Sequence, residues 1–225
     1  MKKILFPLVL FLSFNGFGQT KITKNLEDFT VLKIYSGIHL ELIKSEEQKI
    51  VITGEKAASI KIKNVHKILR ISYPVLKTPS ESKEKVVIYY SKNINIIDAN
   101  EGASITAKEF KQQSVEIKSQ ENALVNMVIN TKHLKVKSVT GGIIKLTGKT
   151  KNEAVEVSSG GLYYGNKLVT ENLCKVTAGL GGKAEVSVGE TLDAKVNFGG
   201  TVFYKGTPEV LKTKKVLGGT IEAQN

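Results

Sequence analysis

Residues 136–145 read VKSVTGGIIK, and residues 155–164 read VEVSSGGLYY. An alternating stretch, a Gly-Gly pair and an apolar stretch thus return in the same order after about 19 residues, which is typical of one solenoid coil. The Gly-Gly pairs are Gly141-Gly142, Gly160-Gly161, Gly181-Gly182, Gly199-Gly200 and Gly218-Gly219, and Gly102-Ala103 and Asn122-Ala123 keep the spacing upstream. We predict an all-β fold, a right-handed parallel β-solenoid (β-helix) with coils of about 19–20 residues.

Each coil has a second strand in which β-branched and charged residues alternate. Because side chains on a strand point to opposite faces in turn, the apolar positions are predicted to stack inward in columns. The inward columns are Val115, Leu134, Val155, Cys174, Ala194, Thr213; then Ile117, Val136, Val157, Val176, Val196, Lys215; then Ser119, Ser138, Ser159, Ala178, Phe198, Leu217. The outward column between them is Glu116, Lys135, Glu156, Lys175, Lys195, Lys214.

The glycine pairs are assigned to sharp corners, because glycine reaches positive φ without a Cβ clash. Opposite charges on successive rungs of the outward column avoid repulsion between neighbours about 4.8 Å apart. Lys215 interrupts an inward column, so we expect the last coil to be frayed, bulged or a cap.

Residues 29–100 are also rich in strands but less regular, and residues 101–225 carry the Gly-Gly repeats. The strands expected in the first part are Phe29–Ile34, Ile38–Ile43, Lys49–Thr53, Ile60–Lys63, Ile68–Tyr73, Val86–Ser91 and Ile94–Ile97. Pro74, Pro79 and Ser80–Glu84 indicate a loop. We predict one domain over residues 19–225, and the first part either covers the solenoid or extends it.

Residues 1–18 are predicted to be a secretion signal. Lys2 and Lys3 precede the apolar run Ile4–Phe14, and Gly16 and Gly18 are small residues near the expected cleavage point. We therefore expect an exported protein, either periplasmic or at the cell surface, and predict no membrane span in the remainder.

The formal net charge is +12, and lysine supplies almost all of the positive charge, since Arg70 is the only arginine. Nucleic-acid recognition favours the planar fork of arginine, so we predict no nucleic-acid partner. Two interpretations of the lysines stay open: weak attraction to acidic polysaccharides, or simple solvation and edge protection of long strands. The single cysteine, Cys174, is predicted to be buried among aliphatic neighbours and inert.

No catalytic residue, metal ligand or cofactor is predicted. The outward carboxylates are scattered, and glycoside hydrolysis needs two carboxyl groups that face one bond. His39, His66 and His133 do not have metal-ligand spacing, and His133 is expected at the surface. The glycine pairs recur in every coil, so they serve turns and do not form a phosphate-binding loop.

The first strand after each glycine pair supplies the candidate binding residues. Its outward positions include an unusually apolar group, and exposed apolar patches tend to mark interaction sites. Tyr163 and Tyr204, nearby, are assigned inward or to the coil edge. Alternatively, residues 29–100 pack over this face and make it core. The predicted ligand-binding residues are Tyr164, Phe203, Ile143, Leu162 and Lys145.

The sequence resembles the GIN-domain family (DUF2807), the head domains of "putative auto-transporter adhesins". The resemblance covers roughly residues 26–223 and is carried by Gly160-Gly161-Leu162, by residues 199–208 (GGTVFYKGTP) and by residues 218–221 (GGTI). It implies a β-solenoid-like fold and an exported location, and it supplies no established ligand or catalytic residue.

From these observations we predict a non-enzymatic binding or adhesion module of the bacterial cell envelope, whose partner is a glycan or an envelope protein. Multivalent contact along a repetitive face would provide the affinity. A self-associating structural protein and a polysaccharide-active enzyme on the same scaffold are the alternatives, because fold class does not decide among them. The sequence does not indicate the oligomeric state.

Overall fold

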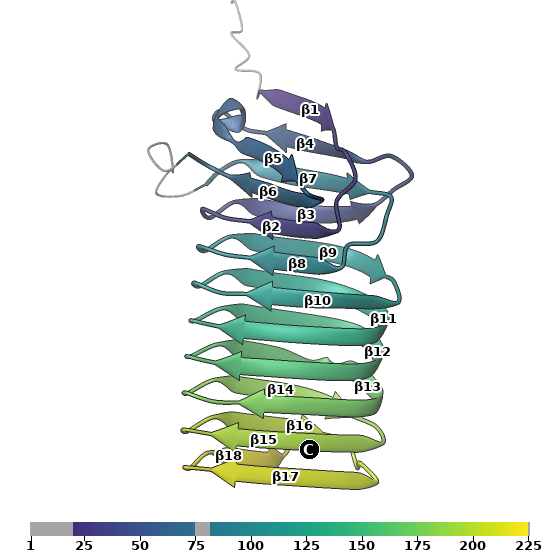
Figure 1. The fold of residues 1–225 in the computed structure, drawn as a ribbon, viewed down its shortest axis with the longest axis vertical. Coiled ribbons are helices and arrows are strands. Elements are labelled where there is room, and N and C mark those ends of the chain that lie inside the picture. The colour runs from purple at the N-terminus through teal and green to yellow at the C-terminus, as the bar shows by residue number, and fades with distance from the viewer. Residues whose placement is uncertain (1–19, 75–81, 225) are drawn as a thin grey trace, which may run out of the picture.

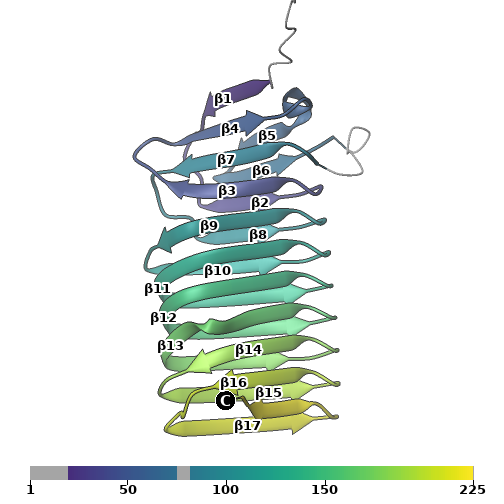
Figure 2. The same cartoon turned by 180° about the vertical axis from the view of Figure 1, so that it is seen from behind.

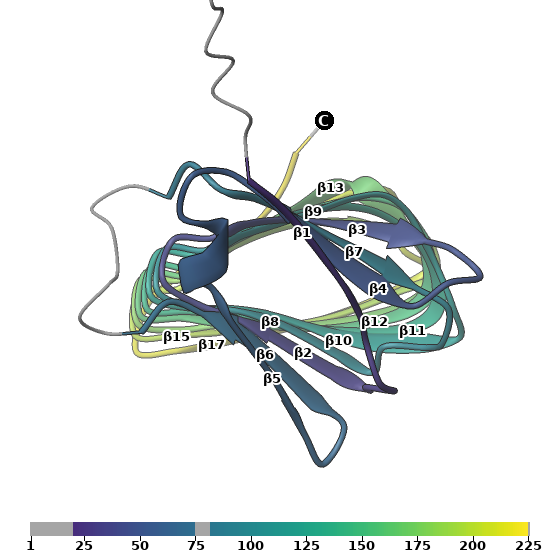
Figure 3. The same ribbon diagram turned by 90° about the horizontal axis from the view of Figure 1, so that it is seen from above.

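The computed structural model describes residues 20–74 and 82–224, so the predicted signal segment and the centre of the predicted proline loop lie outside the described residues. The described chain is a right-handed parallel β-solenoid, and its only helix is the short 3-10 turn η1 (Ala57–Ser59) (Figures 1, 2 and 3). The strands are β1 (Lys21–Asn25), β2 (Val31–Ile34), β3 (His39–Lys44), β4 (Lys49–Thr53), β5 (Lys61–Val65), β6 (Ile68–Ser72), β7 (Lys85–Tyr90), β8 (Ile96–Ala99), β9 (Ser104–Lys111), β10 (Ser114–Ser119), β11 (Leu124–Val139), β12 (Ile143–Ser158), β13 (Leu162–Ala178), β14 (Lys183–Val188), β15 (Thr191–Asn197), β16 (Thr201–Lys205), β17 (Val210–Val216) and β18 (Thr220–Ala223).

Two parallel sheets form the walls of the solenoid, as the view along its axis shows (Figure 3). The first sheet stacks β3, β9, the first halves of β11, β12 and β13, and then β14, β16 and β18. The second sheet stacks β2, β8, β10, the second halves of β11, β12 and β13, and then β15 and β17. β11, β12 and β13 bend around a polar corner and serve both sheets. Isoleucine, valine and leucine fill the space between the walls.

The glycine pairs make the opposite corner, as predicted. The residue before each pair and the first glycine both have positive φ, for example Ser159 at 50° and Gly160 at 72°. The second glycine packs directly on the preceding coil: a Cβ on Gly161 would lie 2.0 Å from the carbonyl oxygen of Ser138. Ser159, Phe198 and Leu217 therefore occupy exposed corner positions, and their predicted inward placement is wrong.

The predicted columns are correct for β10, β11 and β13 and wrong by two residues for β12, β15 and β17. Val115 pairs with Leu134 as expected, but Leu134 pairs with Glu153 and not with Val155. The observed inward columns are Val115, Leu134, Glu153, Cys174, Leu192, Leu211; then Ile117, Val136, Val155, Val176, Ala194, Thr213; then Ser119, Ser138, Val157, Ala178, Val196, Lys215. In the outward ladder, Glu116 forms the expected ion pair with Lys135 at 3.0 Å, whereas Glu156 pairs with Lys137 at 3.0 Å.

Residues 29–100 extend the solenoid. β2 and β3 stack on β8 and β9, and β6 and β7 stack on the other side of β2 and β3. The antiparallel strands β1, β4 and β5 then close this end of the stack (Figure 1). The alternative in which this part covers the candidate face is therefore wrong.

The other end of the stack has no comparable closure among the described residues. β17 pairs with β15 over its whole length, yet all but its last residue are exposed. Lys215 pairs with Val196 and is the last residue of an inward column. It therefore places a positive charge at the open end of the core. An inward-pointing charge on the last strand opposes edge-to-edge pairing with another sheet.

One carboxylate lies inside the core. Glu153 is 3% exposed, and it accepts hydrogen bonds from the Tyr163 hydroxyl and from Thr170 Oγ1, the latter at 2.7 Å. The Cys174 thiol lies 3.6 Å from the same carboxylate, so Cys174 is buried as predicted, but its neighbours are not all aliphatic. Burial raises the pKa of Glu153, although these hydrogen bonds act in the opposite direction.

Candidate functional site

The candidate binding residues lie on the outer surface of the first sheet, in two adjacent columns. Ile143 pairs with Leu162 in one column, and Lys145 pairs with Tyr164 in the next. The columns continue through Lys183 and Glu185 on β14 to Thr201 and Phe203 on β16. Alternation places these side chains outward because their neighbours Ile144, Tyr163, Ala184 and Val202 are fully buried. We call these two columns, from Ile143 to Phe203, the aromatic face.

Tyr164 and Phe203 do not touch on this face, because the rung of Glu185 lies between them. Lys183 connects the two rings: its Nζ lies 5.1 Å from the centre of the Phe203 ring and 6.0 Å from that of Tyr164. Lys145, on the preceding rung, has its Nζ 5.7 Å from the centre of the Tyr164 ring. A cation above an aromatic ring is attracted by the negative face of the ring, so each lysine is held beside a ring.

Glu185 is the polar centre of the aromatic face. Its carboxylate binds Lys183 Nζ at 2.8 Å and accepts a hydrogen bond from Asn166 Nδ2 at 3.0 Å. The predicted site did not include Lys183 and Glu185. The signal was their position in the same column as Tyr164 and Phe203. The face is therefore a mixed aromatic and charged surface, and Ile143 and Leu162 are its apolar part.

Other reactive groups in the described residues lie inside the core or at the surface away from the aromatic face. Glu153 and its partners are enclosed by the core, and burial raises the pKa of the Tyr163 hydroxyl and of the Cys174 thiol well above their usual values. His133 is exposed, as predicted, and contacts Asn152 at 3.4 Å. Within residues 20–74 and 82–224, no group of three or more His, Cys, Asp and Glu is placed to hold a metal ion.

A family model described as "Putative auto-transporter adhesin, head GIN domain" (DUF2807) matches residues 28–208. The match covers most of the chain, so this protein belongs to the GIN-domain family, as the sequence motifs predicted. No curated protein sequence matches the chain.

Three crystal structures share the fold. A putative adhesin from Bacteroides fragilis is 20% identical with a TM-score of 0.83, and the match covers 92% of this chain and 97% of that one. A putative adhesin from Parabacteroides merdae is 21% identical with a TM-score of 0.65, with 94% and 98% covered. A putative lipid binding protein from Parabacteroides distasonis is 18% identical with a TM-score of 0.67, with 94% and 98% covered. At these identities the similarity establishes the solenoid fold alone.

The part of the chain that the structure describes contains no helix long and apolar enough to cross a membrane.

Proposed function

We propose that this protein is an exported, non-enzymatic binding or adhesion module of the bacterial cell envelope, which presents the aromatic face to a glycan. One observation carries the proposal: Tyr164 and Phe203 lie on the outer surface, one rung apart from Glu185, with Lys183 between their rings. The family description as an adhesin head domain supports a role in adhesion.

The chemistry of the aromatic face suits a sugar. Tyrosine and phenylalanine provide flat apolar surfaces for the C–H face of a sugar ring. Glu185, Asn166 and the two lysines provide acceptors and donors for sugar hydroxyl groups, and such polar groups fix the orientation of a ligand. Because both columns run along a rigid stack, neighbouring sugars of one chain can be bound in register, and weak contacts add through multivalency.

Replacing Tyr164 and Phe203 together with alanine should weaken glycan binding by about tenfold or more, because buried aromatic contacts often dominate such interfaces. The measurement is binding to a panel of neutral and acidic glycans at low and moderate salt. Tyr89→Ala is the matched control, because Tyr89 is another half-buried outward ring, with Lys49 Nζ 5.3 Å from its centre. Equal binding by the double variant and the wild type would contradict the site.

Self-association is a second candidate function, and it rests on the glycine corner. At this corner, three successive coils each expose a large apolar side chain. These are Leu180, Phe198 and Leu217, which are 58%, 55% and 72% exposed. A hollow of about 460 Å³ lies against Leu180 and Phe198. A row of large exposed apolar side chains favours contact with another protein surface, including a second copy of this chain.

Under the self-association hypothesis, the double variant Phe198→Ser, Leu217→Ser should shift an oligomer to monomer in sedimentation experiments over a range of protein concentrations. Serine suits these positive-φ positions, because Ser159 adopts a φ of 50° at the same corner. A wild-type protein that stays monomeric at the highest concentration would exclude this candidate.

A further inference from the structure

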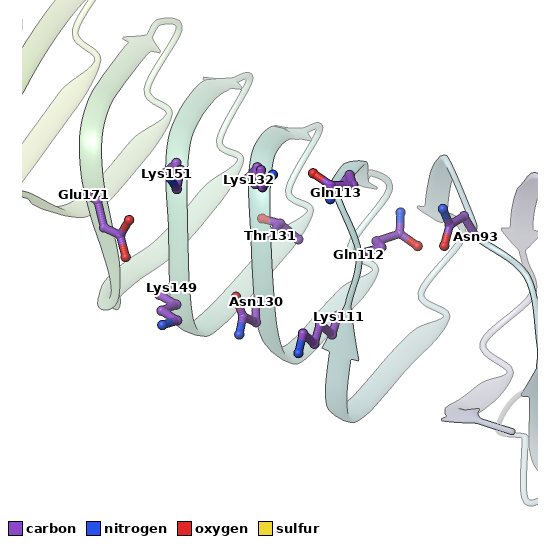
Figure 4. A pocket seen from close by; sticks show the side chains of 10 residues that line it. All are labelled: Asn93, Lys111, Gln112, Gln113, Asn130, Thr131, Lys132, Lys149, Lys151 and Glu171. Atoms are coloured by element: carbon purple, nitrogen blue, oxygen red, sulfur yellow. The ribbon is translucent and has the colours of Figure 1, made fainter.

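A groove of about 470 Å³ runs along the polar corner, at the opposite edge of the sheets from the glycine pairs (Figure 4). Its wall is built from consecutive coils. Lys111, Asn130 and Lys149 are register partners on β9, β11 and β12. Thr131 and Thr150 are also register partners, and the next residue after each is a lysine, Lys132 and Lys151. The backbone N–H of Lys132 donates to the carbonyl of Gln113 at 3.0 Å, which places Gln113 on the neighbouring coil. We call this surface the lysine groove.

The four lysines of this groove, Lys111, Lys132, Lys149 and Lys151, are exposed, and none forms an ion pair with a described residue. On the flat walls, Lys135 and Lys137 pair with Glu116 and Glu156, although other wall lysines form no ion pair with a described residue. Successive rungs lie about 4.8 Å apart, so the groove concentrates like charges that repel one another. The groove lysines differ from the wall lysines because all four line one hollow.

The charge of the corner changes sign along the solenoid axis. Glu171 lies at the edge of the lysine groove, and the next coils place Glu190 and Glu209 at the same corner. The backbone N–H of Glu190 donates to the carbonyl of Glu171 at 3.1 Å, and that of Val210 donates to the carbonyl of Glu190 at 3.1 Å, so the three glutamates follow the stack. The lysines that line the groove therefore belong to the coils of β9 to β12, and an anion would bind there.

The groove is fixed from beneath by a ladder of buried threonines. Thr131 Oγ1 donates to Thr150 Oγ1 at 3.0 Å, and Thr150 Oγ1 donates to the carbonyl of Asn152 at 3.2 Å. Gln112 holds the neighbouring loop, since its side-chain amide donates to the carbonyl of Ile94 at 2.9 Å and accepts from the N–H of Ile94 at 3.2 Å. The floor is thus rigid and the lysines project from it.

We propose that the lysine groove is a second binding site, distinct from the aromatic face, for an extended acidic polysaccharide that lies across successive coils. Lysines on successive rungs can meet carboxylates on successive sugars. The exposed amides of Asn130 and Gln113 both donate and accept, which suits sugar hydroxyl groups better than the acceptor-only oxygens of a polyphosphate. The groove contains no arginine fork for bidentate phosphate recognition. Its volume falls within the range of small-ligand sites.

The test uses the purified protein and three probes: polygalacturonate, a neutral galactan and inorganic polyphosphate. The groove variant replaces Lys111, Lys132, Lys149 and Lys151 with glutamine. The control variant replaces four other exposed lysines, Lys63, Lys175, Lys195 and Lys214, with glutamine. Both variants lose the same total charge, so a difference between them reports position and not net charge. Thermal unfolding of both variants verifies that they are folded.

At an ionic strength near 0.15 M, where free charges are screened beyond about 8 Å, the wild type should bind polygalacturonate and not the neutral galactan. The groove variant should bind polygalacturonate about tenfold or more weaker, and the control variant less than about threefold weaker. Equal losses in the two variants, or no binding by the wild type, would overturn the site.

The double variant Asn130→Ala, Gln113→Ala tests the class of ligand. It should weaken binding to polygalacturonate and not to polyphosphate. If polyphosphate binds as tightly as polygalacturonate and the amide changes leave both unaffected, the assignment to a saccharide is wrong.

Discussion

Replacing Gly161 with valine should lower the free energy of unfolding by about 3 kcal/mol or more, because the new side chain has no space to occupy. A Cβ at this position would lie 2.0 Å from the carbonyl oxygen and 2.4 Å from the carbonyl carbon of Ser138. Both atoms belong to the backbone of the preceding coil, so no rotamer change can relieve the contact. The coils would have to separate, and the parallel hydrogen bonds of the corner would lengthen. Urea unfolding followed by circular dichroism measures the effect.

The adjacent glycine supplies the control. Gly160 has a φ of 72°, and a Cβ there would meet no atom within 4 Å. Asn122 occupies the same corner position in an earlier coil with a φ of 59°, so Gly160→Asn should cost no more than about 1 kcal/mol. Alanine occupies the position of Gly161 in two earlier coils, as Ala103 and Ala123, which shows that the corner adapts to one methyl group where the coils allow it. If Gly161→Val unfolds at the same urea concentration as Gly160→Asn, close packing at the corner is not what the glycine pairs provide.

The sequence predicted the coil length, the glycine corners and the inward or outward direction of most residues on the strands. It did not predict the register of β12, β15 and β17 relative to the other coils. The inward column runs through Leu134, Glu153, Cys174 and Leu192, so the spacing varies from coil to coil. A slip of two residues preserves the alternation of faces, and alternation therefore cannot detect it. Val155 and Ala194 were correctly predicted to point inward but were stacked on the wrong neighbours.

Glu153 explains the two-residue register error in the prediction for β12. A carboxylate is costly to bury, and the preference for charges at the surface favoured a column that ran through Val155. The compensating donors, Tyr163 and Thr170, lie 10 and 17 residues further along the chain, and only the closed coil brings them to the carboxylate. Sequence distance hides such partners.

The aromatic face was predictable in part, because side chains alternate in direction along each strand. Alternation around buried Tyr163 and Val202 placed Tyr164 and Phe203 outward. The contacts of Lys183 with both rings depend on side-chain reach across a rung, and no sequence period encodes that reach. The lysine groove was missed because its members lie at the polar corner, where the sequence indicates only a turn.

The second large effect is expected at Glu153. Replacing Glu153 with leucine should lower the free energy of unfolding by about 3 kcal/mol, because the hydroxyl groups of Tyr163 and Thr170 would remain buried without their acceptor. Glu153→Gln keeps an acceptor oxygen and removes the charge, so it should be much less harmful. A leucine variant as stable as the glutamine variant would contradict a structural role for these hydrogen bonds.

The pH dependence of Glu153→Gln tests the environment of the carboxylate more directly. Burial raises the pKa of Glu153, so the folded state binds its proton more tightly than the unfolded state does. The stabilisation from this proton is complete below the pKa of the unfolded chain and is lost as the pH rises through the folded pKa. The stability of Glu153→Gln relative to wild type should therefore increase with pH, measured by urea unfolding between about pH 4 and about pH 8.

Glu84 provides the opposite case within the same molecule. Burial acts to raise its pKa, but hydrogen bonds from the Tyr73 hydroxyl, from the backbone N–H of Lys56 at 3.0 Å and from Ser82 outweigh burial, and the pKa is lowered. A carboxylate with a lowered pKa contributes stability above the pKa of the unfolded chain and loses it as the pH falls through the folded pKa. Glu84→Gln should thus be least stable relative to wild type near neutral pH, with the difference shrinking in acid. Opposite slopes for the two variants would show that burial determines the favoured protonation state at Glu153, whereas hydrogen bonds determine it at Glu84. Parallel slopes would refute that explanation.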